Sequence, residues 1–426
     1  MTIAQLHQLF LASSGVSTDT RKIESNVIFF ALKGDNFNGN SFATDALQLG
    51  AGYAIIDESE FDTGDKRIVL VNDVLTTLQQ LASYHRQHLA IPIIGLTGSN
   101  GKTTTKELIN AVLSQKFKVT ATKGNLNNHI GVPLTLLSLD ANTEIGLVEM
   151  GANHLKEIAQ LCEICKPDYG YITNFGKAHL EGFGSIEGVI KGKSELYDYL
   201  RSHKKTAFIN TDDSIQMERA KGIEQVLIEN SIKEMPIELA ASNPAVVIQI
   251  GKTTIESNLL GDYNANNIKA ALFIGHYFKV PMAAIKRGIE TYQPTNNRSQ
   301  WIDNKRSKLL LDAYNANPSS MKAALSNFAI HDPYQKSAVI LGDMFELGND
   351  AAKEHQNIAD LAISLNFDNI FLVGENFYLV NNNEKLTKCR EYEDLVVAVQ
   401  KHDFADFNIL IKGSRGMALE RIVSIL

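Results

Sequence analysis

The amino-acid sequence predicts an α/β protein of three domains: a small N-terminal α/β unit, then a central phosphate-loop unit and a C-terminal Rossmann-like doubly wound unit, both on mainly parallel sheets. Three observations support this fold class. The chain has 426 residues, enough for two to four domains at roughly 100–200 residues each. Apolar runs alternate with helix-like segments along most of the chain, as in βαβ units. With 44% hydrophobic and 21% charged residues, the composition is that of a folded globular chain.

The first predicted domain covers residues 1–84, where the apolar runs 27–32, 53–56 and 68–71 are separated by helical or polar stretches. The N-terminal stretch MTIAQLHQLFLASSG lacks the basic region of a secretory signal, and no apolar run reaches the roughly 18 residues of a membrane span. Three Cys cannot form a disulfide framework. We therefore expect a cytoplasmic protein without stable membrane insertion.

The two larger domains are predicted over residues 85–294 and 295–426. The central one contains the strand-like runs IPIIGLT, IGLVEM, YGYITN and TAFIN, and the last one LLLDAY, SAVILGD, IFLVGE and NILIKGS. Open parallel sheets bind ligands beyond the carboxyl ends of their strands. Polar or glycine residues stand at these ends, namely Gly98, Glu149, Asn174, Asp312, Asp343 and Gly413.

The segment TGSNGKTT, between a predicted strand and a helix beginning near Lys102, has the features of a phosphate-binding loop. Glycines let backbone N–H groups face the phosphates, Lys102 supplies a positive charge, and the Thr103 hydroxyl can reach Mg²⁺. The strict GxxxxGK[ST] pattern fails because position 96 is Leu96, so the match is to a shorter GxxGKT form. The alternative is a glycine-rich turn without chemical meaning.

A nucleotide triphosphate requires Mg²⁺, and Glu149 and His179 follow neighbouring strands where ligands are expected. The alternative for His179 is a structural hydrogen-bonding role. By spacing alone, Lys191 and Lys193 belong to the solvated face of a helix. Cys162 and Cys165 form a CxxC without a second pair nearby, which favours a shared buried helix face over a metal site.

The charge balance argues against a polyanionic partner. The chain has 41 Lys+Arg against 48 Asp+Glu, for a formal net charge of −7. Nucleic acids and anionic membranes are bound through basic surfaces, so neither is expected. A local basic site for a phosphorylated small molecule remains compatible with this balance.

Several strings together resemble the Mur ligases, the ATP-dependent amide-forming enzymes of peptidoglycan precursor synthesis. Besides TGSNGKTT, they are STDTRKIESNVIFFALKGDNFNGNSF, NLNNHIGVPLTLL, EMGANH, TNFGKAHL and GDYNANNIKAA. The C-terminal strings DAYNANPSSM, LGDMFELG and KGSRGMALE resemble the branch of the family that adds D-alanyl-D-alanine. The resemblance covers essentially the whole chain.

This resemblance implies an ATP-dependent ligase of the bacterial cytoplasm. It would join D-alanyl-D-alanine to UDP-N-acetylmuramoyl-tripeptide through an acyl phosphate, giving the pentapeptide precursor. The first domain would hold the UDP end, the second ATP with two Mg²⁺, and the third would close over the site. We expect small-molecule partners only, a monomer, and hinges near 84–90 and 292–297. The general base and the third tripeptide residue are left open.

The resemblance also implies roles for individual residues. Phosphate and nucleotide contacts fall on Gly98, Asn100, Gly101, Lys102, Thr103, Thr104, Asn264, Asn267, Arg298 and Asp312. Metal ligands are Thr103, Glu149, His179 and a carbamylated Lys193, with Lys191 as the alternative carbamate. Catalytic roles fall on Lys102, Lys193, His179 and Arg298. Tyr263 stands where the family commonly has His.

Substrate contacts are implied in all three domains. The UDP end would meet Ser17, Thr18, Asp19, Arg21, Lys33, Gly34, Asn38 and Gly39, which without the resemblance read as solvated turns. The substrate-side segment of the central domain supplies Asn125, Asn127 and Asn128. The dipeptide end would be shaped by Tyr314, Asn315, Asn317, Asp343, Met344 and Glu346, with Lys412, Ser414 and Arg415 as anion partners. The alternative, a nucleotide-binding scaffold without chemistry, is disfavoured by the intact GKTT, Glu149, His179 and Lys193.

Overall fold

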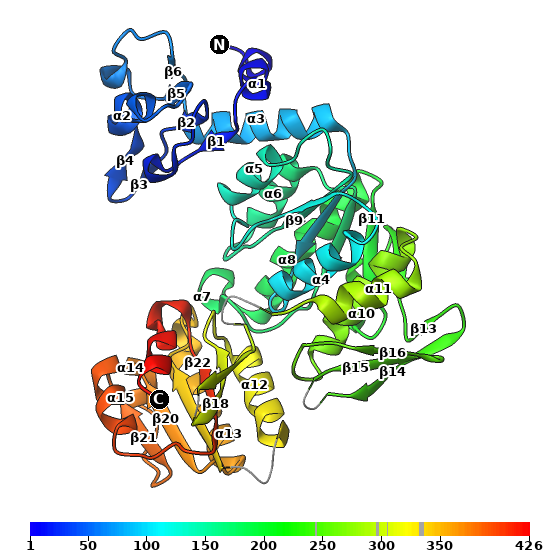
Figure 1. The fold of residues 1–426 in the computed structure, drawn as a ribbon, viewed down its shortest axis with the longest axis vertical. Helices are drawn as coiled ribbons and strands as arrows, with labels where there is room; N and C mark the ends of the chain where they lie inside the picture. Colours follow the sequence, from blue (N-terminus) through cyan, green and yellow to red (C-terminus); the bar gives the residue numbers. More distant parts are fainter. Residues whose placement is uncertain (243–244, 295–297, 305, 332–335) are drawn as a thin grey trace.

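The computed structural model describes residues 1–426 except 243–244, 295–297, 305 and 332–335. Three bodies, each built around its own main sheet, follow one another along the chain, with the central body between the other two (Figure 1). The predicted α/β class with three domains is confirmed. In the part of the chain described, no helix combines the length and apolarity needed to cross a membrane.

The N-terminal sheet has four parallel strands in the order β1-β2-β5-β6. Ile28 and Phe30 pack with α1 and α3 on one face, whereas Phe29 packs with α2 on the other, so β2 is buried on both sides. The strands are β1 (Val16–Ser17), β2 (Ile28–Phe30), β5 (Tyr53–Ile56) and β6 (Ile68–Leu70), with a hairpin of β3 (Lys33–Gly34) and β4 (Phe37–Asn38). The helices are α1 (Ile3–Leu11), α2 (Ala43–Gln48) and α3 (Val74–Leu89).

Helix α3 connects the first two bodies without a break. Asp73 caps its N-terminus by accepting a hydrogen bond from Thr76, and the helix packs against α1 on one side and α5 and α6 on the other. The boundary expected at residues 84–85 and the hinge expected at 84–90 therefore fall within a packed helix and its C-cap. The structure argues against that hinge, because bending there would break helical hydrogen bonds and buried contacts. Part of the second expected hinge, residues 295–297, lies outside the described residues.

The central sheet has six parallel strands in the order β12-β11-β10-β7-β9-β8. Its middle strand β7 is buried at every position, as expected for a parallel sheet covered by helices on both faces. The strands are β7 (Ile93–Thr97), β8 (Val119–Ala121), β9 (Ile145–Glu149), β10 (Tyr169–Ile172), β11 (Thr206–Asn210) and β12 (Glu224–Ile228). The helices are α4 (Lys102–Leu113), α5 (Gly131–Leu137), α6 (Glu157–Cys165), α7 (Leu180–Phe183), α8 (Ile186–Ser202), α9 (Ser214–Arg219), α10 (Asn264–Tyr277) and α11 (Met282–Thr291).

Two features of this domain bear on the sequence predictions. Cys162 and Cys165 are free and buried on one face of α6, as predicted. A four-stranded antiparallel sheet, absent from the predictions, lies beside α10 and α11 (Figure 1). Its strands are β13 (Ser231–Ile232), β14 (Met235–Ala241), β15 (Val247–Ile250) and β16 (Thr253–Glu256).

The C-terminal sheet has the order β17-β18-β22-β19-β20-β21, with β17 antiparallel to β18 and the rest parallel. Its strands are β17 (Gln300–Asn304), β18 (Ser307–Asp312), β19 (Lys336–Gly342), β20 (Asn369–Val373), β21 (Leu386–Cys389) and β22 (Phe407–Lys412). Its helices are α12 (Pro318–His331), α13 (Ala351–Ser364), α14 (Glu375–Tyr378) and α15 (Tyr392–Val399). Short 3₁₀ turns occur at Thr20–Lys22, Gly39–Phe42, Ser59–Phe61, Gly348–Asp350, Arg415–Met417 and Leu419–Ser424.

Candidate functional site

The predicted phosphate loop joins the end of β7 to the start of α4. Gly98 and Gly101 adopt positive φ angles of 145° and 75°, which residues with a side chain rarely adopt. A Cβ at Gly98 would lie 2.0 Å from Thr173 Oγ1, so only glycine fits there. Asn174, at the end of β10, brackets the loop: its Oδ1 accepts from Asn100 N at 3.1 Å, and its Nδ2 donates to Asn100 O at 3.0 Å. The backbone is thus held in an anion-binding shape at a helix N-terminus.

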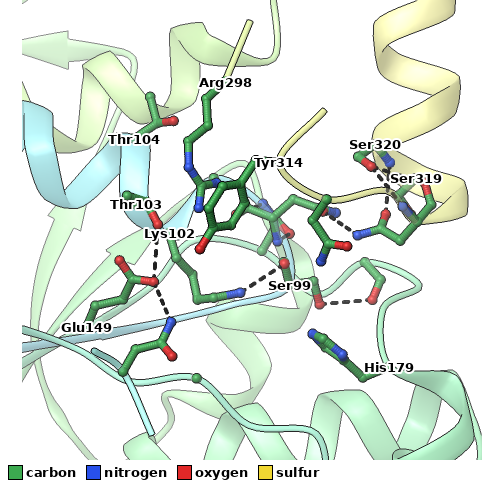
Figure 2. A pocket seen from close by; sticks show the side chains of 18 of the residues that line it. Ser99, Lys102, Thr103, Thr104, Glu149, His179, Arg298, Tyr314, Ser319 and Ser320 are labelled. Carbon is green, nitrogen blue, oxygen red and sulfur yellow. Dashed lines mark hydrogen bonds between the residues drawn. The ribbon is translucent and has the colours of Figure 1, made fainter. Parts of the chain in front are cut away.

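The Lys102 ammonium lies inside this loop (Figure 2). Its Nζ donates to Gly98 O at 2.7 Å and Ser99 O at 3.1 Å. Burial lowers the pKa of Lys102 to about 8, and the nearby Glu149 carboxylate partly opposes that shift. Among the described residues, the hydrogen-bond acceptors of Lys102 are these carbonyl oxygens, and a phosphate entering the loop would supply an anionic partner.

Glu149 ends β9 and is 1% exposed. Its Oε1 accepts from Thr103 Oγ1 at 3.2 Å and from Asn127 Nδ2 at 2.8 Å. Within the described residues its Oε2 has no hydrogen-bond partner and lies 3.5 Å from Lys106 Nζ. A buried carboxylate oxygen without a donor fits a site that receives a divalent cation. No three His, Cys, Asp or Glu side chains of the described chain cluster as a preformed metal site.

Lys106 was missed by sequence reasoning. It stands one helical turn after Lys102 on the same face of α4, is only 2% exposed, and faces the Glu149 carboxylate from inside the domain. The sequence does show that Lys102 and Lys106 stand four residues apart in GKTTTK, a spacing that places both on one face of a helix. It gave no reason to place the second lysine inside the protein, because a lysine on a helix is usually solvated.

Lys193 is fully buried on α8, and its Nζ donates to Ala152 O at 2.8 Å. The Phe183 ring lies 5.0 Å from the same Nζ. Burial holds the pKa of Lys193 well below its usual value, which favours the neutral amine. The solvated-face interpretation is therefore wrong for Lys193. It holds for Lys191, which is exposed.

The C-terminal domain brings Arg298 and Tyr314 to the site. The guanidinium of Arg298 stacks 3.6 Å from the centre of the Tyr314 ring, and both point toward the phosphate loop (Figure 2). Arg298 Nε is buried without a hydrogen-bond partner among the described residues. Asp312 accepts from Lys412 Nζ at 2.6 Å and from Ser299 N at 3.1 Å.

One cavity of about 820 Å³ is lined by the phosphate loop, Glu149, Arg298, Tyr314 and Asp312, but not by Lys106 or Lys193. Across it, Asn317 Nδ2 donates to Asn100 Oδ1 at 2.7 Å, which joins the C-terminal domain to the phosphate loop. Predicted residues that line the cavity are Asn100, Gly101, Lys102, Thr103, Thr104, Asn125, Asn127, Asn128, Glu149, His179, Asn264, Asn267, Arg298, Asp312, Tyr314, Asn315, Asn317 and Lys412.

Family models match almost the whole chain. A Mur ligase family catalytic domain matches residues 13–86, a Mur ligase middle domain residues 96–275, and a Mur ligase glutamate ligase domain residues 297–415. The UDP-N-acetylmuramoyl-tripeptide--D-alanyl-D-alanine ligase of Bacillus subtilis (strain 168) is 34% identical over 420 residues, covering 96% of this chain and 92% of that protein. The chain belongs to the Mur ligase family. The predicted membership is confirmed.

Other relatives are also similar to this chain over almost its whole length. The ligase of the same name from Escherichia coli (strain K12) is 32% identical over 425 residues, covering 96% of this chain and 93% of that protein. A crystal structure of MurF from Acinetobacter baumannii has a TM-score of 0.84 at 29% identity, covering 98% of this chain and 97% of that one. MurF from Thermotoga maritima, solved in complex with ADP, shares the fold with a TM-score of 0.84 at 23% identity and the same coverage.

Some residues assigned through the Mur ligase resemblance already have protein partners. Asn267 Nδ2 donates to Asn264 Oδ1 at 2.7 Å, and Asn267 Oδ1 accepts from Thr105 Oγ1 at 3.0 Å. To hydrogen-bond adenine, the Asn267 amide would have to break its bonds to Asn264 or Thr105. Tyr263, the position where the Mur ligases commonly have His, forms a hydroxyl contact of 3.0 Å with Ser299.

The prediction that Asp343 shapes the dipeptide end is not supported. Asp343 is 3% exposed, does not line the cavity, and accepts hydrogen bonds of 2.9 Å from the backbone N–H groups of Asn376 and Phe377. Its carboxylate therefore caps the short helix α14. Met344 and Ser414 are buried too. None of Met344, Glu346, Ser414 and Arg415 lines the cavity.

The residues predicted for the UDP end lie in the N-terminal domain and do not line this cavity. Arg21 holds Asp19 through two hydrogen bonds of 2.9 and 2.8 Å, which lower the pKa of Asp19 to about 2. Lys33 Nζ lies 3.1 Å from Asp57 and 3.2 Å from Glu58, and Asn38 Nδ2 donates to Glu58 at 2.6 Å. The others are Ser17, Thr18, Gly34 and Gly39, in strands β1, β3 and the adjoining turns.

Proposed function

We propose that the protein is an ATP-dependent amide ligase that joins D-alanyl-D-alanine to UDP-N-acetylmuramoyl-tripeptide in the bacterial cytoplasm. The name shared by its full-length relatives supports this substrate pair. One structural observation carries the proposal: the phosphate loop of the central domain and the DAYNANPSSM segment of the C-terminal domain line the same cavity. A ligase needs this arrangement because the activated acid and the attacking amine must meet while water is excluded.

The chemistry begins with a carboxylate, which is a poor electrophile. The terminal carboxylate of the tripeptide attacks the γ-phosphorus of ATP, ADP leaves, and an acyl phosphate forms. The amine of D-alanyl-D-alanine then attacks the acyl carbon, and inorganic phosphate leaves as the amide forms. Lys102 and Arg298 are placed to stabilise the negative charge that builds up on the phosphoryl oxygens.

The residues present fit a divalent cation. Thr103, Glu149 and His179 line the cavity and would hold Mg²⁺, which would neutralise phosphate charge when bound. We further propose that Lys193 is carbamylated and contributes a second anionic ligand. Its burial supports this proposal because the neutral amine is the form that attacks CO₂, forming an N–C bond and releasing one proton.

The proposal is tested by measuring phosphate release with defined substrates. We expect release only when ATP, UDP-N-acetylmuramoyl-tripeptide and D-alanyl-D-alanine are all present. Equal release with a single L-amino acid in place of the dipeptide would assign the protein to another step of precursor synthesis. Release with a folate and glutamate would contradict the proposal entirely.

A further inference from the structure

Glu346 lies on the C-terminal domain, in the loop that follows β19, and reaches across to His179 of the central domain. Its carboxylate oxygen Oε2 accepts a hydrogen bond from His179 Nδ1. The His179 ring lines the cavity, and its other nitrogen, Nε2, is hydrogen-bonded to no protein group among the residues described.

The backbone around this contact is fixed on both sides. Glu181 N donates to Glu346 O at 3.0 Å, which adds a main-chain bond between the domains. His179 and Glu346 have φ of 52° and 60°, both in the left-handed region that non-glycine residues rarely adopt. Such conformations persist only where surrounding contacts hold them, and they concentrate at functional sites.

This geometry is the one that prepares an imidazole to bind a metal. When Nδ1–H is donated to a carboxylate, the tautomer is fixed, the ring orientation is set, and the lone pair of Nε2 is left for a cation. Here the orienting carboxylate comes from a different domain than the imidazole. Sequence reasoning assigned Glu346 to the dipeptide end, yet its side chain pairs with His179 and does not line the cavity.

We propose that Glu346 is a positioning residue that orients His179 for a divalent cation, so that the metal site is complete only when the C-terminal domain is docked. This rests on the proposed function, in which His179 is a metal ligand. Because coupling between binding events is reciprocal, a bound metal also favours the docked domain. The same coupling free energy applies in both directions, so loss of Glu346 or His179 should weaken both metal binding and docking of the C-terminal domain.

The test uses Mn²⁺ with ADP and measures free Mn²⁺ by electron paramagnetic resonance, independently of turnover. We expect Glu346→Ala to weaken Mn²⁺ binding about 10- to 100-fold, the usual cost of removing an orienting partner. His179→Ala should weaken it at least as much. Glu346→Gln keeps an acceptor oxygen and should restore much of the affinity.

Glu354→Ala is the matched control. Glu354 pairs with Lys177 Nζ at 2.6 Å across the same interface, and no contact joins it to His179 among the residues described. Its loss removes a docking contact but leaves Glu346 to orient His179, so Mn²⁺ affinity should fall much less than in Glu346→Ala. An effect as large as that of Glu346→Ala would overturn the positioning role. Wild-type affinity in Glu346→Ala overturns the proposal as well, whereas wild-type affinity in His179→Ala overturns the assignment of His179 itself. Should Glu346→Ala fail to fold, Glu346→Ser is judged by the same criterion.

Discussion

The central domain meets its two neighbours through interfaces of different character. Toward the N-terminal domain, helix α3 packs along α5 and α6, and its buried Arg86 pairs with Asp168 at 2.6 Å. Toward the C-terminal domain, the polar contacts are Lys177 with Glu354, His179 with Glu346, and Asn100 with Asn317. Lys177 and Glu346 have about half of their side chains exposed, at 50% and 48%, whereas their partners Glu354 and His179 are 7% and 18% exposed.

The difference indicates which domain can move. In each of the two ion pairs toward the C-terminal domain, water already solvates one half-exposed side chain, which lowers the cost of separating the pair. The Arg86–Asp168 pair costs more to separate, because the Arg86 side chain is 8% exposed and would lose its hydrogen bonds to Cys165 O, Lys166 O and Asp168 together. The cavity lies at the separable interface, so we infer that the C-terminal domain opens and closes over it while the N-terminal domain stays attached.

The largest expected effect is on stability at the N-terminal interface. Arg86 also donates to Cys165 O and Lys166 O, so Arg86→Ala removes several buried hydrogen bonds and one partner of Asp168. We expect a loss of about 3 kcal/mol in the free energy of unfolding, measured by urea denaturation. The matched Lys177→Ala should cost less, about 1–2 kcal/mol, because the lysine is half-exposed although its partner Glu354 is buried. Similar losses in both variants would remove the distinction between the interfaces.

The second-largest expected effect is on catalysis in the cavity between the central and C-terminal domains. Lys102→Ala removes the cation of the phosphate loop, and we expect phosphate release to fall about 100- to 1,000-fold, as for loss of a group that stabilises transition-state charge. The melting temperature should change little, since the hydrogen bonds that Lys102 makes within the described part of the chain go to loop carbonyl oxygens. A near-normal rate would show that the loop does not bind the reacting phosphate.

A smaller effect is expected from the two lysines of α8. Lys193→Ala should lower turnover about 10- to 100-fold, as for loss of a group that supports a metal site, and a short-chain carboxylate should partly restore it. The exposed Lys191→Ala should behave as the wild type. Equal behaviour of the two variants in the same assay would restore the surface interpretation of Lys193.

The smallest expected effect is on how the stability of the N-terminal region depends on pH. His7 contacts His85 Nδ1 at 3.0 Å, and burial lowers the pKa of His7 from 6.5 to about 4. The unfolded chain therefore binds more protons between these values, so stability is complete above about pH 6.5 and falls as the pH drops toward 4. His7→Phe cannot be protonated, and its melting temperature should fall less between pH 7 and pH 5. An equal fall in both proteins would contradict this origin.

The sequence predicted the parts of the site that depend on local pattern. A strand, a glycine loop and a helix place Lys102 and Thr103, and the parallel sheet brings Glu149 beside them. Contacts between distant segments could not be predicted in this way. The burial of Lys106, the capping role of Asp343 and the pairing of Glu346 with His179 depend on how separate elements pack.

The same limit applies to the fold. Buried parallel strands such as β11 appear as continuous apolar runs, which is why their positions were predicted. The antiparallel sheet was missed because β14 is mostly exposed and carries no such run. The domain boundary expected at residues 84–85 falls inside α3, because a change of domain does not require a break in secondary structure.

The most direct test of the account measures domain positions with spin labels. Because Cys162, Cys165 and Cys389 are buried, labels can be placed at introduced cysteines, in pairs at Leu49 with Met217 and at Met217 with Leu379. These three positions are exposed and represent the N-terminal, central and C-terminal domains in turn. On adding ADP, Mg²⁺ and UDP-N-acetylmuramoyl-tripeptide, we expect the second distance to change and the first to stay constant. An unchanged second distance, or an equal change in both, would contradict the account.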